Sequence, residues 1–107
     1  MQITVSKYSV ISPAKHLIFR DMGEEVAILN PKFKTPYVLS GAGVIIWNLI
    51  QKFKTINEIL DTLLEKYEVD LSQCEHDLLV FLQELADEEL IEVTVMEQPN
   101  LREVSSA

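Results

Sequence analysis

The chain has 107 residues, a formal net charge of −8 and 48% hydrophobic residues. This length suits one domain with one hydrophobic core and is too short for two. No stretch approaches the ~18 consecutive apolar residues of a membrane-spanning helix, and the amino terminus lacks the pattern of a secretory signal. The one cysteine, Cys74, cannot form an internal disulfide, so the composition predicts a cytoplasmic protein with no membrane partner.

The amino-terminal part of the chain has the pattern of short strands. Alternating apolar and polar residues, including Ile3 and Val5, predict a strand or extended arm within residues 1–14. Residues 16–21 and 25–30 are expected to pair through a hairpin turn. Residues 35–39 then form a third strand, so the pattern predicts a three-stranded antiparallel sheet.

Three amphipathic helices are expected next. The first, around Trp47, is apolar on nearly every side and is therefore predicted to be mostly core. The second begins after Thr55, because Thr55 and Glu58 have the spacing of a capping box. The third begins after Asp70 as its cap and runs over residues 71–87, the longest element of the chain.

These elements predict an α+β fold of winged helix-turn-helix type, with a three-stranded antiparallel sheet followed by three helices. The predicted domain spans residues 15–95 and ends with a possible short strand at 90–95. Residues 1–14 precede the domain, and residues 96–107 lack periodicity and are predicted to form a mobile tail.

The charge is unevenly distributed along the chain. Residues 1–54 carry a formal charge of +4 and residues 55–107 carry −12, and the stretch from Leu71 to Glu92 contains seven acids and no Lys or Arg. A DNA-reading helix approaches a polyanion and needs basic residues. The predicted third helix therefore argues against nucleic-acid binding, although a DNA-binding regulator remains the competing class.

Residues suited to catalysis are sparse. His16 lies on a predicted strand and His76 on the outward side of the third helix, and no nucleophile is spaced to meet a base. Cys74 and His76 fall on different helix faces, and one Cys with one His cannot complete a four-ligand zinc site. We therefore predict no enzyme activity, no metal and no cofactor.

The order of motifs resembles the PqqD family, over about residues 15–93. The motifs are YVL, SGAGVIIWNLI, TINEILDTLLEKYEVD and CEHDLLVFLQELADEELIE, in that order. Two departures stand out: Ser40 replaces a frequent Asn, and residues 52–54 replace a usual glycine turn before Thr55. Members of this family act in pyrroloquinoline quinone biosynthesis, and their relatives are called RiPP recognition elements, where RiPP denotes a ribosomally made and post-translationally modified peptide.

The resemblance implies a peptide chaperone of natural product biosynthesis. Such a protein binds the leader segment of a precursor peptide as an added strand, between the third strand and the third helix, and presents it to a modifying enzyme. That enzyme could be a radical S-adenosylmethionine enzyme, a peptidase or a cyclase. A scaffold subunit of an enzyme complex is a further alternative, and an exposed edge could also support a homodimer.

An exposed strand edge suits this role because its unpaired N–H and C=O groups can bind any extended peptide, while neighbouring pockets select side chains. Phe81 and Tyr37 could equally be packing residues. The acids of the helix would favour a leader with Lys or Arg. The predicted binding residues are Thr35, Tyr37, Val38 and Leu39 on the strand, and Asp77, Leu78, Phe81 and Glu84 on the helix, with Val80 and Glu88 as further candidates.

Overall fold

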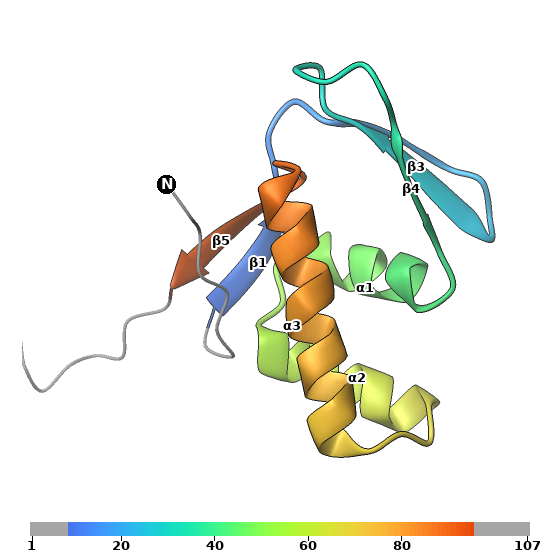
Figure 1. The fold of residues 1–107 in the computed structure, drawn as a ribbon, viewed down its shortest axis with the longest axis vertical. Helices are drawn as coiled ribbons and strands as arrows, with labels where there is room; N and C mark the ends of the chain where they lie inside the picture. The colour runs from blue at the N-terminus through green and yellow to red at the C-terminus, as the bar shows by residue number, and fades with distance from the viewer. Residues whose placement is uncertain (1–8, 96–107) are drawn as a thin grey trace, which may run out of the picture.

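The computed structural model describes residues 9–95, so the predicted features at Ile3 and Val5 and the predicted tail at 96–107 lie outside the described residues. Figure 1 shows a helical body with a sheet that projects from one end. In chain order the elements are β1 (Ser9–Pro13), β2 (Ile18–Asp21), β3 (Glu25–Leu29), β4 (Tyr37–Ser40), α1 (Ala42–Ile50), α2 (Ile56–Lys66), α3 (Leu71–Asp87) and β5 (Ile91–Val95).

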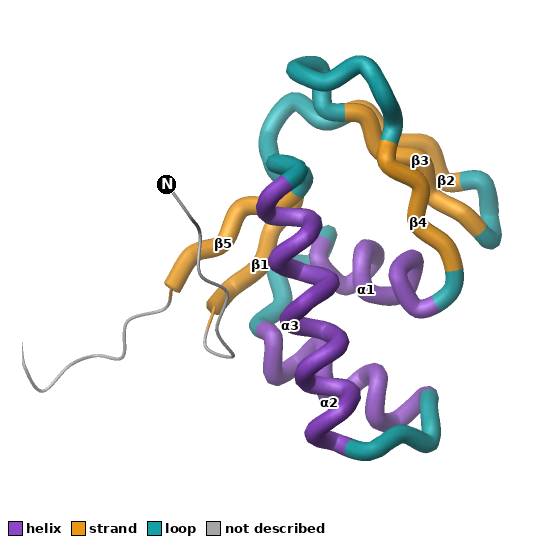
Figure 2. The backbone as a smooth tube through the Cα atoms, viewed as in Figure 1, coloured by secondary structure: helices purple, strands orange, loops and turns teal. Residues whose placement is uncertain are grey.

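The predicted three-stranded antiparallel sheet is confirmed, with β3 in the centre and β2 and β4 at the edges (Figure 2). Ile28 pairs with Tyr37 and Val26 with Leu39, so these side chains share one face of the sheet. Val26, Ile28 and Leu39 are buried in the core. The face that they form is therefore the inner face, which packs toward the helices.

Two strands begin later than the sequence pattern predicts. β2 begins at Ile18 rather than at residue 16, because His16 adopts a left-handed backbone with φ of 65° that interrupts an extended strand. β4 begins at Tyr37 rather than at Thr35. Pro36 has no N–H to donate to a ladder, which is consistent with this later start.

The amino-terminal strand belongs to a second, two-stranded sheet. β1 pairs antiparallel with β5, with Pro13 opposite Ile91. Ile11 is fully buried, and its backbone N–H donates to the carbonyl of Lys54 at 3.1 Å. The strand at Ser9–Pro13 therefore packs against the helices and contributes Ile11 to the hydrophobic core.

Both predicted helix caps are present. The Thr55 hydroxyl accepts from the Glu58 N–H at 3.2 Å, and the Glu58 carboxylate accepts from the Thr55 N–H at 2.9 Å, which completes a capping box at the start of α2. The Asp70 carboxylate accepts from the Gln73 N–H at 3.1 Å at the start of α3. These bonds satisfy N–H groups that have no partner within the helix.

Trp47 links the three-stranded sheet to the helical body. It lies on α1 with 1% of its surface exposed; Ile46 and Ile50 of this helix are also buried, whereas Val44, Ile45 and Leu49 are partly buried against the core. Its indole ring contacts the ring of Phe19 on β2 edge to face, with centroids 5.7 Å apart and planes at 80°. One hydrophobic core therefore holds both sheets and all three helices together.

No helix in the part of the chain between residues 9 and 95 is both long and apolar enough to cross a membrane.

Replacing Thr55 by Ala should lower the free energy of unfolding by about 1 kcal/mol, because the cap of α2 loses its hydroxyl acceptor. Denaturant unfolding followed by Trp47 fluorescence measures this change, and Thr55→Ser, which keeps the hydroxyl, serves as the control.

The hydrogen bonds from Thr55 hold the pKa of Glu58 below its ordinary value of 4.5. A group with a lowered folded-state pKa stabilises the fold above its unfolded pKa and loses this effect as the pH falls. Thr55→Ala keeps the backbone N–H of residue 55 that bonds the carboxylate, so this pH-dependent part is tested with Glu58→Gln. The difference in stability between Glu58→Gln and the wild type should shrink as the pH falls below 4.5; an equal difference at low pH would contradict the capping box.

Candidate functional site

One edge of the three-stranded sheet is free beside the longest helix. β4 pairs with β3 on one side, and no other strand pairs with it among residues 9–95. The Tyr37 hydroxyl of β4 donates to the Glu84 carboxylate of α3 over 3.4 Å. Figure 2 likewise shows β4 as the strand of this sheet nearest to α3. Unpaired main-chain groups therefore lie next to a helix face.

The α3 face beside β4 is a single stripe. Asp77, Phe81, Glu84 and Glu88 follow a spacing of three and four residues, which places them along one side of a helix. We call β4 together with this stripe the strand–helix site. Phe81 is half-buried, whereas the three acids are exposed. The site thus presents one apolar ring between carboxylates.

An apolar pocket of about 390 Å³ continues the strand–helix site beyond the end of β4. Gly43 in the pocket lining shows this position, because it lies between Phe81 of the stripe and Leu39 of β4. A Cβ added at Gly43 would meet the Phe81 ring at 3.4 Å and the Leu39 side chain at 3.6 Å. Asp77 and Gln73 supply polar groups in its lining, and the Gln73 amide donates to the Asp77 carboxylate at 2.8 Å. The full lining is Ala42, Gly43, Ile46, Leu63, Tyr67, Val69, Gln73, Cys74, Asp77, Leu78 and Phe81.

Most of this lining was missed by sequence reasoning, which assigned only Asp77, Leu78 and Phe81 to the site. Residues of α1 and α2 such as Ile46 and Leu63 have the pattern of ordinary core residues. The sequence offered one signal, the apolar residues Tyr67 and Val69 in the connection between α2 and α3; the structure shows them 39% and 49% exposed. Exposed apolar residues beside a cavity are typical of binding surfaces.

Cys74 contributes an uncharged thiol to the pocket. Its pKa is raised from the ordinary value of 9.0, first by burial and then by the nearby charge of Asp77. The thiol is therefore protonated at neutral pH and behaves as a small apolar side chain.

The predicted strand residues do not all face α3. Tyr37 and Leu39 share the inner face, but Leu39 is only 3% exposed and is a core residue. Val38 lies on the opposite face with 52% of its surface exposed. Thr35 is exposed and precedes β4. Of this group, Tyr37 is the residue that hydrogen-bonds to the helix stripe, through Glu84.

The predicted helix residues are divided between core and surface. Leu78 is 2% exposed and forms a wall of the pocket as well as part of the core. Phe81 packs partly against the core and partly lines the pocket, and its contact with a peptide stays a prediction. Val80 is 46% exposed and does not line the pocket, whereas Glu88 lies near enough to Tyr37 to affect its ionisation.

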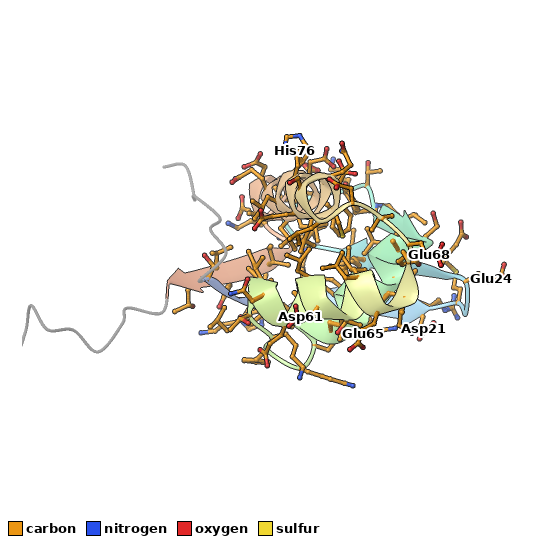
Figure 3. All side chains as sticks on the ribbon, turned by 90° about the horizontal axis from the view of Figure 1, so that it is seen from below. Asp21, Glu24, Asp61, Glu65, Glu68 and His76 are labelled. Carbon is orange, nitrogen blue, oxygen red and sulfur yellow. The ribbon has the colours of Figure 1, made fainter. Side chains whose placement is uncertain are left out.

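Catalytic groups are not brought together in the described structure. His76 points outward from α3, away from the helical body (Figure 3). His16 lies far along the chain in the connection between β1 and β2. Between residues 9 and 95 there is no cluster of three or more His, Cys, Asp or Glu that could hold a metal ion.

These features define a winged-helix-like α+β domain with an open strand edge beside a helix and an apolar pocket. Residues 25–91 match the family described as "Coenzyme PQQ synthesis protein D (PqqD)". The chain therefore belongs to the PqqD family.

A solved structure titled "TbiB1 in Complex with the TbiA(beta) Leader Peptide" has the same fold, with a TM-score of 0.72 and 32% sequence identity. The similarity covers 76% of this chain and 94% of that chain. Among curated proteins, none matches the sequence significantly.

The contact between Tyr37 and Glu84 can be tested through the ionisation of the phenol. Burial, the Glu84 charge, the hydrogen bond to Glu84 and the Glu88 charge all raise the pKa of Tyr37 above 10.0. Replacing Glu84 by Gln should lower this pKa toward its ordinary value, because a neutral amide does not oppose the phenolate. Titration of ¹³C-labelled tyrosine rings by NMR measures the shift, with Glu75→Gln as a control. An unchanged pKa in Glu84→Gln would show that the two side chains are not in contact.

Proposed function

We propose that this protein is a RiPP recognition element that binds the leader segment of a precursor peptide as an added strand on β4. The observation that carries the proposal is the free edge of β4 beside α3, continued by the apolar pocket. The similarity to TbiB1, whose structure contains a leader peptide, supports the same use of this surface.

The geometry separates affinity from selectivity. A peptide that extends the sheet gains main-chain hydrogen bonds from β4 whatever its sequence. Its alternate side chains then point to the inner face, toward Phe81 and the pocket. The pocket is lined largely by apolar side chains, with Asp77 and Gln73 among its few polar groups, so it would accept an apolar side chain of the leader.

Charge favours a leader with a basic residue. Asp77, Glu84 and Glu88 are exposed along the α3 stripe, and this helix carries no Lys or Arg. The same acids oppose a nucleic-acid backbone. The comparisons give no support to the alternative of a DNA-binding regulator.

The partner that acts on the bound peptide is a modifying enzyme, and this protein serves as the binding module that delivers the substrate. Strand addition leaves the far end of the peptide free, so the precursor core can extend toward another protein. A radical S-adenosylmethionine enzyme, a peptidase or a cyclase could act there.

Leader binding should depend on the α3 stripe. Phe81→Ala removes the apolar ring and Glu84→Lys reverses a charge, so each should weaken binding of a leader peptide by about tenfold, which corresponds to roughly 1.4 kcal/mol. The measurement is a calorimetric titration with the TbiA(beta) leader as the probe. Glu65→Lys is the matched control, because Glu65 lies on α2, on the side away from α3 (Figure 3). Unchanged affinity in both α3 variants would remove the helix from the site.

The pocket can be tested by filling it from Gly43. Gly43→Leu should weaken leader binding, because its side chain would occupy the space beside Phe81. Gly43→Ala is the control, since its Cβ would make only ordinary van der Waals contacts at 3.4 Å or more. If Gly43→Leu stays folded and binds the leader as tightly as Gly43→Ala, no leader side chain enters the pocket.

A further inference from the structure

α3 ends in a tight turn whose left-handed position is a glutamate. The Glu89 N–H donates to the Ala86 carbonyl at 3.0 Å and the Leu90 N–H to the Leu85 carbonyl at 2.9 Å, the two bonds of a Schellman motif. Glu89 has φ of 58°, where glycine is the usual residue because a Cβ is strained there. This position is therefore occupied by a residue that its backbone alone does not favour.

The carbonyl and the carboxylate of Glu89 are both bound by the loop between β3 and β4. The Asn30 side-chain amide donates to the Glu89 carbonyl at 2.9 Å, and the Lys32 ammonium pairs with the Glu89 carboxylate at 2.8 Å. The Asn30 side-chain oxygen in turn accepts from the Lys32 N–H at 3.0 Å. A glycine could supply the carbonyl but not the ion pair, which gives the glutamate a physical role.

Lys32 offsets a concentration of negative charge at this end of α3. Asp87, Glu88 and Glu89 follow one another where the helix dipole is negative, and the last turn contains no basic residue. Lys32 is distant from these acids in sequence, but its ammonium lies beside Glu89 in the fold. Its bond to Glu89 is the single ion pair found between residues 9 and 95.

This contact lies near one end of the strand–helix site. The loop that carries Asn30 and Lys32 joins β3 to β4: Asn30 directly follows β3, and Ile28 near the end of that strand pairs with Tyr37 at the start of β4. Glu89 lies just beyond the last turn of α3. At the other end of the site, β4 continues through Gly41 into α1, where Gly43 lies beside Phe81. β4 is thus joined covalently to the helices at its end, and its start is held through the paired end of β3, which the contact with Glu89 fixes.

We propose that Asn30, Lys32 and Glu89 form a clasp that fixes β4 relative to α3 and thereby sets the affinity of the strand–helix site for its peptide. The three are positioning residues that act through β4, and the binding part of this inference rests on the proposed function. Opening the clasp leaves the inner face of the sheet packed on the core through Val26, Ile28 and the Phe19–Trp47 contact. The fold should therefore survive while β4 becomes more mobile.

The test uses the double variant Asn30→Asp/Lys32→Met in the full chain. Aspartate keeps the oxygen that accepts from the backbone N–H of residue 32 but removes the donor to Glu89, and methionine removes the ammonium. Lys34→Met is the matched control, since Lys34 is an exposed lysine of the same loop. The charge swap Lys32→Glu/Glu89→Lys, which restores an ion pair, serves as the rescue.

Two readouts separate positioning from a general loss of stability. Without peptide, amide hydrogen exchange of Tyr37–Ser40 should accelerate about tenfold in the double variant, whereas exchange in the β1–β5 ladder should not change. The dissociation constant of the leader peptide should rise about tenfold, mainly through faster dissociation, and the charge swap should recover part of it.

The outcomes are distinguishable. If the wild type binds a leader and the double variant matches it in both exchange and affinity, the clasp is overturned and the proposed function stands. If no leader binds the wild type, the proposed function and the binding role of the clasp fail together. Faster exchange confined to Tyr37–Ser40 would in that case still support the fixing of β4 by the clasp.

Discussion

The arrangement depends on one constraint: a sheet of three strands must bury a face, and it cannot avoid having two edges. Such a small sheet gains its stability from packing against helices. Val26, Ile28 and Leu39 supply the buried face, and Trp47 of α1 meets it through Phe19 of β2. Both β2 and β4 have an outer edge with no strand partner among the described residues, but β4 runs into α1 after Ser40, so this edge strand is the one held beside the helices.

Local pattern was enough to predict much of this fold. The capping box at Thr55 and the cap at Asp70 appear where their side chains predicted them, because caps depend on residues only three positions apart. The pairing of β1 with β5 was not predicted, since it joins opposite ends of the described chain and no local signal encodes it. Left-handed residues were missed for another reason. His16, Phe53 and Glu89 all have positive φ, yet none is a glycine that would mark the position.

The candidate site also has one part that the sequence predicted and one part that it did not. The α3 stripe follows from helical spacing, so Asp77, Phe81 and Glu84 could be placed together from the sequence. The pocket is different, because it is a space left between three helices and each of its apolar walls has an ordinary core pattern. Val38 shows the limit for strands: alternation assigns neighbours to opposite faces, but only the register with β3 shows which face is the inner one.

An open edge is also a hazard, since any extended chain can pair with it. β4 limits this hazard by its length of four residues, with Pro36 before it and Gly41, at φ of 58°, after it. A peptide that adds to so short an edge forms only a few main-chain hydrogen bonds, each of which contributes about 0.5–1.5 kcal/mol. Main-chain pairing alone is then too weak for stable binding, so under the proposed function a chain without side chains to suit Phe81 and the pocket would be released. The shortness that protects the edge against indiscriminate pairing would therefore also make the proposed binding depend on side-chain selection.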